Sequence, residues 1–343
     1  MDKVILITGG AGFIGSHLVE YFLNKYNNYY IINLDALTYA ADIKRLNHIS
    51  NKQNYKFIHG NICQIDLIEN LFKEYNISDV IHLAAESHVD NSLANPRIFI
   101  ETNIQGTFNL LESARNHWSS QDNINSKFLH ISTDEVYGSL GDTGYFSENS
   151  PYAPNSPYSA SKASSDFLVR SYFHSYNLPT IISNCSNNYG PRQHNEKLIP
   201  TIIRKALNGE PIPIYGNGKN IRDWLYVEDH CSALDLIFHK GVVGENYNIG
   251  TRNEQTNLEL ANKICNILDE LRPHTDSTPY AKQVTYVTDR AGHDFRYAID
   301  NTKLCSELNW SSKFSFMDSL RLTVEWYINL SGFNSPKLCF VIS

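Results

Sequence analysis

The sequence lacks the clustered cysteines that a disulfide framework or a zinc site requires. Its six cysteines are widely spaced along 343 residues and form no CxxC motif: they occupy positions 63, 185, 231, 265, 305 and 339. We therefore expect free thiols in a reducing compartment and no metal site.

The sequence also lacks a basic run and any apolar run long enough to span a bilayer. It has 29 Lys and Arg against 36 Asp and Glu, a formal charge of −7 and a pI of about 6.0. This mildly acidic balance argues against nucleic acid as a partner. The N-terminus leads directly into a predicted strand, and Cys339 is fifth from the end, so we expect no signal peptide, prenylation motif or membrane partner, and a cytoplasmic location.

What is present is a composition able to bury a large core, with 42% hydrophobic and 19% charged residues. In the first half, short apolar runs alternate with amphipathic stretches of helical length. Strands are predicted at Val4–Thr8, Tyr30–Leu34, Lys56–His59, Asp79–Ala84, Lys127–Ser132 and Thr180–Ser183, and helices at Phe13–Tyr26, Asp42–Ile49, Gln64–Tyr75, Pro96–His117 and Tyr158–Tyr176. This order predicts an α/β fold whose parallel sheet is covered on both faces.

The pattern loosens after about residue 186, where proline and glycine become frequent, and a helix (Val227–His239) and a strand (Glu245–Gly250) then return. We interpret residues 1–186 and 223–250 as one discontinuous sheet domain. A smaller, mostly C-terminal domain would comprise residues 187–222 and 251–330, with helices at Leu258–Leu271 and Phe316–Tyr327. Residues 331–343 are expected to be a tail without function.

A glycine-rich loop follows the first predicted strand, with Gly9, Gly12 and Gly15 in a GxxGxxG spacing before an apolar helix. The same spacing recurs within residues 138–144, but no apolar helix follows it there. In the strand–helix context, glycines let the backbone approach a pyrophosphate, and the helix N-terminus offers free N–H groups. Asp35 lies twenty residues past Gly15, where it would accept hydrogen bonds from a ribose diol. We therefore predict a Rossmann-type, doubly wound, dinucleotide-binding sheet, and NAD rather than NADP, because Asp35 would repel a 2′-phosphate.

Tyr158 and Lys162 are one helical turn apart on the helix after the fifth strand, near the strand ends where open α/β sheets bind ligands. Two other Tyr-xxx-Lys pairs occur, at residues 21–25 and 215–219. The first faces away from the predicted crevice, and glycines interrupt the second. Tyrosine is a poor base because its pKa is near 10, but an ammonium group nearby favours the phenolate. The alternative is an exposed helical pair.

The fifth strand ends in Thr133, Asp134 and Glu135. One interpretation is a capping box, Ser132-x-x-Glu135, with Asp134 favouring a helix N-terminus. The other follows from location, because these acids emerge at the same sheet edge as the cofactor crevice. Two adjacent carboxylates there cannot both ionise easily, so one becomes a protonated acid and the other a base. Oxidation of an alcohol needs neither, so the pair indicates a second step, an elimination.

These motifs resemble extended short-chain dehydrogenases and, more narrowly, dTDP-glucose 4,6-dehydratases. The resemblance covers residues 3 to about 328. It rests on runs that begin at Thr8, Leu83, Ser132, Tyr158, Ser186, Glu196 and Ile221. Asp134 is its most discriminating residue. Sugar-nucleotide 4-epimerases lack the acid pair, and UDP-glucuronate decarboxylases and GDP-mannose dehydratases usually have Thr-Ser-Glu there.

The resemblance implies a mechanism in which NAD stays bound and is regenerated at each turnover. Tyr158, tuned by Lys162 and assisted by Thr133, takes the proton of the sugar 4-hydroxyl while C4 gives its hydride to NAD. Glu135 then removes the C5 proton and Asp134 protonates the departing C6 oxygen. The hydride returns to C6, and C5 is reprotonated. The product is a 4-keto-6-deoxyglucose nucleotide on a route to deoxysugars such as rhamnose.

The resemblance also implies binding positions. For NAD these are Gly9, Gly12, Phe13, Ile14, Gly15, Asp35, Leu37, Thr38, Asn61, Ile62, Leu83, Ala84, Ala85, Thr102, Tyr158, Lys162 and Asn188. For the nucleotide-sugar they are Ser87, Thr133, Asn187, Lys197, Leu198, Pro213, Tyr215, Arg222, Asn257, Arg290 and His293. Three residues depart from the family's usual pattern: Asn61, Asn184 and Asn195.

The leading hypothesis is therefore an NAD-dependent nucleotide-glucose 4,6-dehydratase acting on dTDP-glucose or UDP-glucose. A 4-epimerase or UDP-glucuronate decarboxylase of the same fold is the alternative enzyme, and a non-catalytic NAD-binding scaffold is the alternative of another class. The resemblance further implies a homodimer packed through helices at 96–117 and 158–176.

Overall fold

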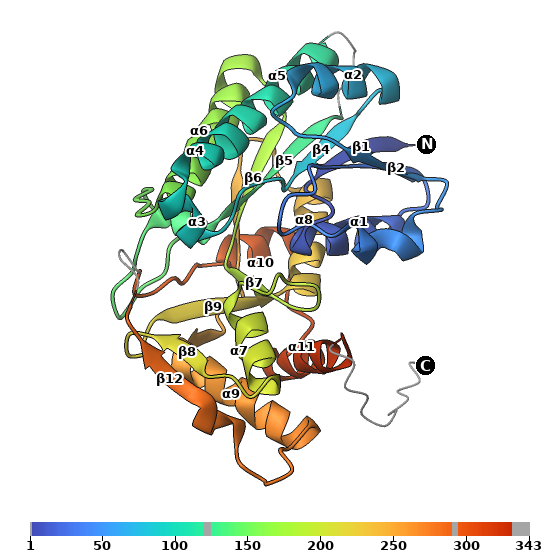
Figure 1. Cartoon of the computed structure of the whole chain (residues 1–343). Helices are drawn as coiled ribbons and strands as arrows, with labels where there is room; N and C mark the ends of the chain where they lie inside the picture. The colour runs from blue at the N-terminus through green and yellow to red at the C-terminus, as the bar shows by residue number, and fades with distance from the viewer. Residues whose placement is uncertain (1, 120–124, 290–293, 331–343) are drawn as a thin grey trace.

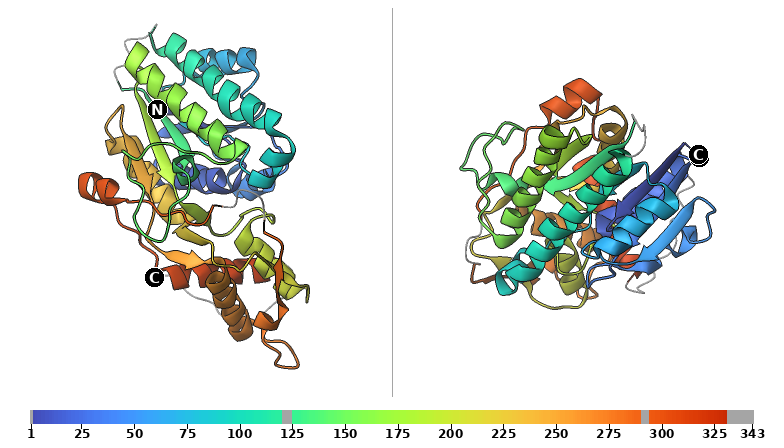
Figure 2. Two further views of the ribbon diagram at one scale, coloured as in Figure 1. Left: turned by 90° about the vertical axis from the view of Figure 1, so that its left-hand side faces the viewer. Right: turned by 90° about the horizontal axis from the view of Figure 1, so that it is seen from above.

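The computed structural model describes residues 2–119, 125–289 and 294–330. Figure 1 shows a larger part built on one broad sheet above a smaller part that contains β8, β9, β12, α7, α9 and α11. Figure 2 shows the same two parts from the side and from above.

The larger part is a seven-stranded sheet in the order β10-β6-β5-β4-β1-β2-β3, and every neighbouring pair is parallel. The strands are β1 (Lys3–Thr8), β2 (Tyr29–Asp35), β3 (Tyr55–His59), β4 (Asp79–His82), β5 (Lys127–Thr133), β6 (Thr180–Cys185) and β10 (Asn246–Ile249). The strand order reverses between β1 and β4, which is the point where doubly wound sheets bind ligands. The predicted Rossmann-type fold is confirmed.

Helices cover both faces of this sheet because alternate residues of its buried strands point to opposite sides. Ile5 and Ile7 of β1 pack in a core with α1 (Phe13–Lys25) and α8 (Val227–Lys240). Leu6, between them, packs in the core on the other face. There it meets residues of α2 (Ile65–Tyr75), α5 (Thr107–Ser119) and α6 (Pro157–Tyr176).

Two predicted helices differ in kind from what was expected. The segment predicted at Asp42–Ile49 is a 3₁₀-helix, η1 (Ile43–Ile49). The segment predicted as one helix at Pro96–His117 is divided into α4 (Pro96–Phe99), the π-helix η2 (Ile100–Gly106) and α5. A further short helix, α3 (Val89–Ala94), precedes α4.

The smaller part has its own core and two small sheets, one with the order β11-β9-β7 and one that pairs β12 with β8. Its strands are β7 (Asn187–Tyr189), β8 (Ile212–Tyr215), β9 (Ile221–Tyr226), β11 (Glu254–Thr256) and β12 (Val284–Val287). Its helices are α7 (Leu198–Leu207), α9 (Asn257–Leu271), η4 (Tyr280–Gln283) and α11 (Phe316–Leu330).

The chain passes between the two parts more than once. Strand β10 returns to the large sheet beside β6. Strand β9 crosses the boundary predicted at residues 222 and 223. Helix α10 (Thr302–Leu308), which the predicted boundaries assign to the smaller domain, packs against β10 and α8 of the larger part. The predicted domain division itself stays a prediction.

Within residues 2–119, 125–289 and 294–330, no helix has the length and apolarity needed to cross a membrane. Five cysteines lie in these ranges and all are free thiols, as expected: Cys63, Cys185, Cys231, Cys265 and Cys305. Cys339 lies outside the described residues.

Candidate active site

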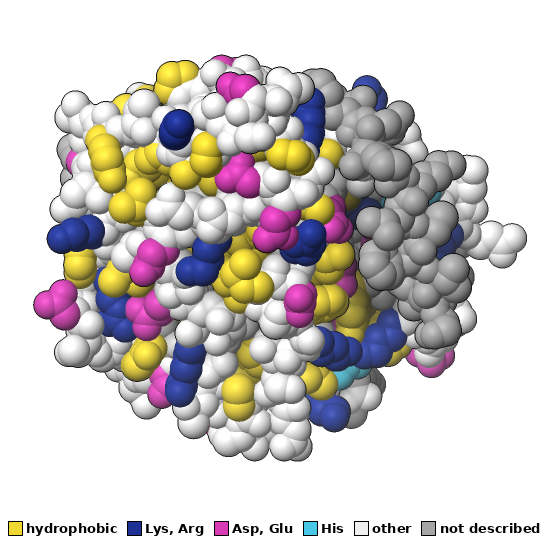
Figure 3. All heavy atoms as spheres, turned by 90° about the horizontal axis from the view of Figure 1, so that it is seen from below, with side chains coloured by type: hydrophobic (Ala, Val, Ile, Leu, Met, Phe, Trp, Pro, Cys, Tyr) yellow, Lys and Arg dark blue, Asp and Glu magenta, His cyan; other side chains and the backbone are white. Residues whose placement is uncertain are grey.

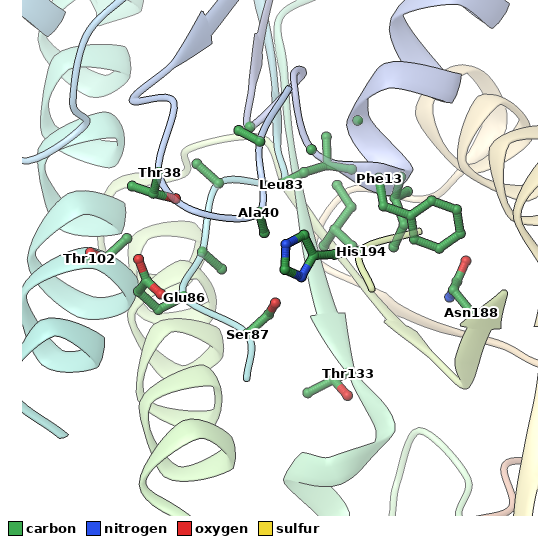
Figure 4. A pocket seen from close by; sticks show the side chains of 18 of the residues that line it. Phe13, Thr38, Ala40, Leu83, Glu86, Ser87, Thr102, Thr133, Asn188 and His194 are labelled. Carbon is green, nitrogen blue, oxygen red and sulfur yellow. The ribbon is translucent and has the colours of Figure 1, made fainter. Parts of the chain in front are cut away.

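A cavity of about 300 Å³ opens at the carboxyl edge of the large sheet. Its walls come from the loops that follow β1, β2, β4, β5 and β6. Figure 4 shows Thr38, Glu86 and Thr102 on one side of this cavity and Phe13 and Asn188 on the other, with His194 between them and Thr133 at the end of β5. The cavity therefore joins the glycine loop to the acidic end of β5.

The glycine loop is packed so closely that side chains would not fit. Gly9 has a φ of +74°, and a Cβ there would lie 2.7 Å from the backbone nitrogen of Ala84. A Cβ on Gly15 would lie 2.1 Å from the carbonyl oxygen of Gly9. Gly12 is the N-cap of α1 and provides no side-chain cap, so the first N–H groups of the helix keep their capacity to bind an anion. The loop fits a pyrophosphate group.

Asp35 is the last residue of β2, and each of its two carboxylate oxygens accepts a hydrogen bond from a backbone N–H group. Its Oδ2 accepts from the N–H of Ala11 at 2.9 Å, and its Oδ1 accepts from the N–H of Leu37 at 2.8 Å. Each carboxylate oxygen has a second lone pair, so the group can also accept from a ribose diol. Burial raises the pKa of Asp35, against the opposing effect of these two hydrogen bonds. These residues fit an NAD molecule.

At the end of β5 a side chain does cap a helix, as the capping interpretation predicted, but the capping residue differs from the predicted one. Thr133, not Ser132, is the N-cap of the 3₁₀-helix η3 (Asp134–Tyr137), and its hydroxyl accepts from the N–H of Glu135 at 3.3 Å. The hydroxyl of Ser132 instead donates to Asp166 Oδ2 at 2.7 Å. Because capping uses Thr133, it does not account for the two carboxyl groups.

Asp134 is the buried member of the acid pair, with 2% of its surface exposed, while Glu135 is intermediate. Burial raises the pKa of Asp134 well above its usual value, and the charges of Glu135 and Asp223 add to this effect. Its Oδ1 accepts from the Thr133 hydroxyl at 3.4 Å. Its Oδ2 is buried and has no hydrogen-bond partner among the described residues. Asp134 is therefore suited to hold a proton and donate it to a ligand.

Tyr158 and Lys162 lie in the first turns of α6, which a Ser156–Ser159 capping box begins. Both are buried and both line the cavity. Burial, followed by the charge of Glu135, raises the pKa of Tyr158 well above its usual value. This is opposite to the decrease that we expected from Lys162, because desolvation of the buried phenol disfavours the phenolate. Thr133 opposes the rise by hydrogen bonding to the phenol.

Most of the residues predicted to bind the cofactor line the cavity. The exception is Leu37, whose backbone has a left-handed φ of 51° and contacts Asp35 instead. The lining residues are Gly9, Gly12, Phe13, Ile14, Gly15, Asp35, Thr38, Asn61, Ile62, Leu83, Ala84, Ala85, Thr102, Tyr158, Lys162 and Asn188.

Only some of the residues predicted to bind the substrate line the cavity. Ser87, Thr133, Asn187 and Lys197 line the cavity, and Lys197 donates to the carbonyl oxygen of Ser87 at 3.1 Å. Five belong to the smaller part and do not line the cavity: Leu198, Pro213, Tyr215, Arg222 and Asn257. Arg290 and His293 lie outside the described residues.

Arg222, predicted to bind the substrate diphosphate, is instead hydrogen-bonded to backbone carbonyl groups of the protein. Its guanidinium is buried and donates to the carbonyl oxygens of Ile221, Asp294 and Phe295. It also lies over the ring of Tyr297, 4.4 Å from the ring centroid. Asp134 and Glu135 nevertheless act on its charge, so this cation stands near the acid pair.

Several lining residues were not predicted from the sequence. Glu86 follows β4, and its backbone N–H donates to Asn103 Oδ1 at 2.9 Å. Gln193, His194 and Glu196 belong to the loop after β7, and Glu196 accepts from the hydroxyl of Tyr39 at 3.2 Å. The available signal was their position beside predicted residues, Glu86 before Ser87 and the others before Lys197.

Comparison with known proteins places the chain in a family. The family model described as GDP-mannose 4,6 dehydratase matches residues 6–323. A dTDP-glucose 4,6-dehydratase of Salmonella typhimurium is 52% identical over 346 residues, which cover 97% of this chain and 95% of that protein.

Two solved structures are similar to this chain in fold as well as in sequence. The dTDP-glucose 4,6-dehydratase of Bacillus anthracis in complex with NAD is 45% identical, with a TM-score of 0.86 over 96% of this chain and 98% of that one. The enzyme of the same name from Streptomyces venezuelae, also with NAD bound, is 42% identical, with a TM-score of 0.87 over 97% and 99% of the two chains. The chain therefore belongs to the family of the dTDP-glucose 4,6-dehydratases.

Proposed function

We propose that this protein is an NAD-dependent hydro-lyase that converts dTDP-glucose to the 4-keto-6-deoxyglucose nucleotide and water. The observation that carries this function is the buried carboxyl of Asp134 beside Glu135, in the same cavity as Tyr158 and Lys162. An oxidation site and an acid–base pair in one cavity are what an elimination that passes through a ketone requires.

The residues divide the proton transfers among them. Tyr158 takes the proton of the sugar 4-hydroxyl as a phenolate, which the Lys162 ammonium and the positive nicotinamide ring of bound NAD would favour. Thr133 hydrogen-bonds to the Tyr158 side chain. Glu135 then removes the proton from C5, which the 4-ketone has acidified. Asp134, protonated because it is buried, gives its proton to the departing C6 oxygen, which leaves as water.

When bound, NAD would accept the hydride of C4 and return it to C6 while C5 takes up a proton, so no net reduction occurs. The glycine loop and the N-terminus of α1 would hold its pyrophosphate, and Asp35 its adenosine ribose. Asn61 would meet the adenine, with its Oδ1 occupied by the N–H of Cys63 at 2.9 Å, so that its Nδ2 is left to donate.

The nucleotide part of the substrate would extend toward the smaller part of the molecule. Ser87, Asn187 and Lys197 line that side of the cavity, and Leu198 begins α7 directly after Lys197. Of the cations predicted for the diphosphate, Arg222 is instead held by backbone carbonyl groups, whereas Arg290 and His293, outside the described residues, stay candidates. The thymidine nucleotide is favoured over uridine by the names of the relatives.

The test is turnover of dTDP-glucose and UDP-glucose side by side. We expect keto-sugar absorbance in alkali to appear with dTDP-glucose and NAD, with no net NADH. Formation of dTDP-galactose with no keto-sugar would instead indicate a 4-epimerase. Faster turnover of UDP-glucose than of dTDP-glucose would show that the nucleobase of the substrate is uracil rather than thymine.

We also propose a homodimer formed through the helices on one face of the large sheet. Exposed apolar side chains gather on adjacent elements there: Leu93 on α3, Ile98 on α4, Ile100 on η2, Phe108 on α5 and Phe167 on α6. These helices pack side by side, and such a row of apolar groups is typical of an interface.

We place the enzyme in the cytoplasm, since free thiols and an NAD-dependent reaction suit a reducing compartment. Its partner would be a small nucleotide-sugar rather than nucleic acid. On the face of the molecule in Figure 3, basic and acidic side chains are interspersed, which does not favour a polyanion.

A further inference from the structure

Lys162 is one end of a chain of buried polar side chains that runs behind the active site. Its Nζ donates to the carbonyl oxygen of Ile131 at 2.8 Å and lies 3.3 Å from Nε2 of His130. The same Nε2 lies 3.1 Å from Oδ1 of Asp166. Lys162, His130 and Asp166 are each at most 4% exposed, so water does not screen them from one another.

One ring nitrogen of His130 thus faces a cation, a carboxyl group and also the hydroxyl of Ser165, which lies 3.3 Å away. Nε2 can accept from Lys162 only through its lone pair, and it can donate to Asp166 only when it carries a proton. The other nitrogen, Nδ1, is buried with no hydrogen-bond partner among the described residues. Either tautomer can therefore form without breaking a hydrogen bond at Nδ1.

Asp166 is fixed so that only one of its oxygens faces His130. Oδ2 accepts from the hydroxyl of Ser132 at 2.7 Å and from that of Tyr152 at 3.0 Å, and Asn184 Nδ2 lies at 3.5 Å. Oδ1 has the His130 ring as its neighbour. These donors stabilise a negative charge on Asp166 close to Lys162.

We propose that Asp166 is a positioning residue whose buried carboxylate, on the same His130 nitrogen as Lys162, keeps Lys162 charged behind Tyr158 while the sugar C4 is oxidised. The inference rests on the proposed function of the same cavity. When Lys162 is charged, it donates to His130 Nε2. When Lys162 has lost its proton to solvent, the neutral His130 ring can carry its single proton on Nε2 instead of Nδ1 and donate it to Asp166.

The charges around Lys162 support this direction. Burial lowers the pKa of Lys162 to about 8, and Asp166 opposes that decrease. Burial raises the pKa of Asp166 to about 6, against the effect of Lys162. Burial keeps His130 neutral by lowering its pKa well below the usual value. The titratable groups that interact with Lys162 are His82 of β4, His130 of β5, Asp166 of α6 and Cys185 of β6. Tyr158 lies one turn before it on α6, and Glu135 of η3 acts on Tyr158.

The test compares the wild-type enzyme with Asp166→Asn by the pH dependence of the C4-oxidation rate in single turnovers. We expect the alkaline limb, near pH 8 in the wild type, to move down by at least about one pH unit, which lowers the rate at pH 8 about fivefold. A correlation spectrum of lysine Nζ, assigned with Lys162→Met, should lose the Lys162 ammonium signal at a correspondingly lower pH.

The matched control is Asp79→Asn. Asp79 is also a buried carboxyl paired with a lysine, Lys3 at 2.8 Å, but it lies at the start of β4, at the far edge of the sheet. This variant should lose stability and keep the wild-type pH profile. An unchanged alkaline limb and an unchanged lysine signal in Asp166→Asn would overturn the proposal.

A measurement on the wild type alone covers the case in which Asp166→Asn does not fold. The ¹⁵N shifts of the His130 ring should change tautomer over the pH range in which the Lys162 signal disappears. A tautomer that stays the same through that range would overturn the proposal. Because both spectra are recorded without substrate, they report on the coupling even if dTDP-glucose proves not to be the substrate.

Discussion

His230 Nδ1 donates to Asn188 Oδ1 at 2.8 Å, and this bond connects a fully buried histidine of α8 to a side chain of the cavity wall. Because Oδ1 is occupied by His230, the amide nitrogen of Asn188 is oriented toward the carbonyl oxygen of Ser186 at 3.0 Å. His230 thereby sets which end of Asn188 is presented to a ligand.

This histidine should make the fold sensitive to acid. Burial lowers the pKa of His230 to about 3, so the folded chain keeps it neutral while the unfolded chain protonates it below about pH 6.5. Its contribution to stability is present above pH 6.5 and is lost as the pH falls toward 3. Between pH 7 and 5 this residue should cost about 2 kcal/mol of unfolding free energy. Urea unfolding of His230→Gln should show that much less loss, whereas the exposed His174→Gln should behave as the wild type.

Glu135→Gln should separate oxidation from elimination. The amide cannot take the C5 proton, so keto-sugar formation should fall by roughly 10²- to 10⁴-fold, the range of general acid–base catalysis. The near-ultraviolet absorbance of reduced nicotinamide should still appear, because Tyr158 and Lys162 are intact. Product formation at the wild-type rate would remove Glu135 from the mechanism.

Asp134→Asn should slow the loss of water most when the leaving group is poor. The amide cannot donate the proton that the C6 oxygen needs, so turnover of dTDP-glucose should drop by roughly 10²-fold or more. An analogue with a better leaving group at C6 should recover most of the rate. If the analogue gave no recovery, the assignment of Asp134 as the acid would be wrong.

Gly15→Ala should abolish NAD binding and lower stability, since its Cβ would meet the Gly9 carbonyl oxygen at 2.1 Å and displace the loop. Gly141→Ala is the matched control. It belongs to the other GxxGxxG spacing, and its Cβ would meet nothing within 4 Å. Calorimetric NAD titration and thermal unfolding of both variants should show a loss for the first only.

If the homodimer forms through the exposed apolar side chains of α3 to α6, then two negative charges introduced among them should prevent association. Phe108→Glu with Phe167→Glu should give a monomer in analytical ultracentrifugation, because buried unpaired charges at an interface are costly. Tyr286→Glu changes an exposed aromatic of β12 in the smaller part and should leave the mass unchanged. A double variant with the wild-type mass would place the interface elsewhere.

The sheet could be predicted from the sequence because its strands are short apolar runs separated by helix-length segments, and the glycine loop followed from its strand–helix context. The π-helix η2 could not. Its apolar periodicity runs on into α5, and the irregularity coincides with Gly106, whose missing side chain makes room for Ile62 2.5 Å from the ideal Cβ position. Such a tertiary contact leaves no periodic signal.

At the site, the sequence indicated that the acid pair would divide into one acid and one base, while the assignment of Asp134 came from resemblance. Burial supports that assignment, since Asp134 is enclosed and Glu135 is not. The network behind Lys162 was not predictable, because His130 and Asp166 meet only through the packing of α6 on β5. The same limit applies to Arg222, because two of its three carbonyl partners, Asp294 and Phe295, are more than seventy residues away.

The late position of β10 in the chain has a consequence for biosynthesis. Its neighbour β6 leaves the ribosome first, and the outer edge of β6 then waits, unpaired, until residues 246–249 have been made. Open strand edges readily associate with other polypeptides. Nascent or truncated chains that end before Asn246 should therefore depend on chaperones, and premature termination in this interval should yield aggregates rather than a small working dehydratase.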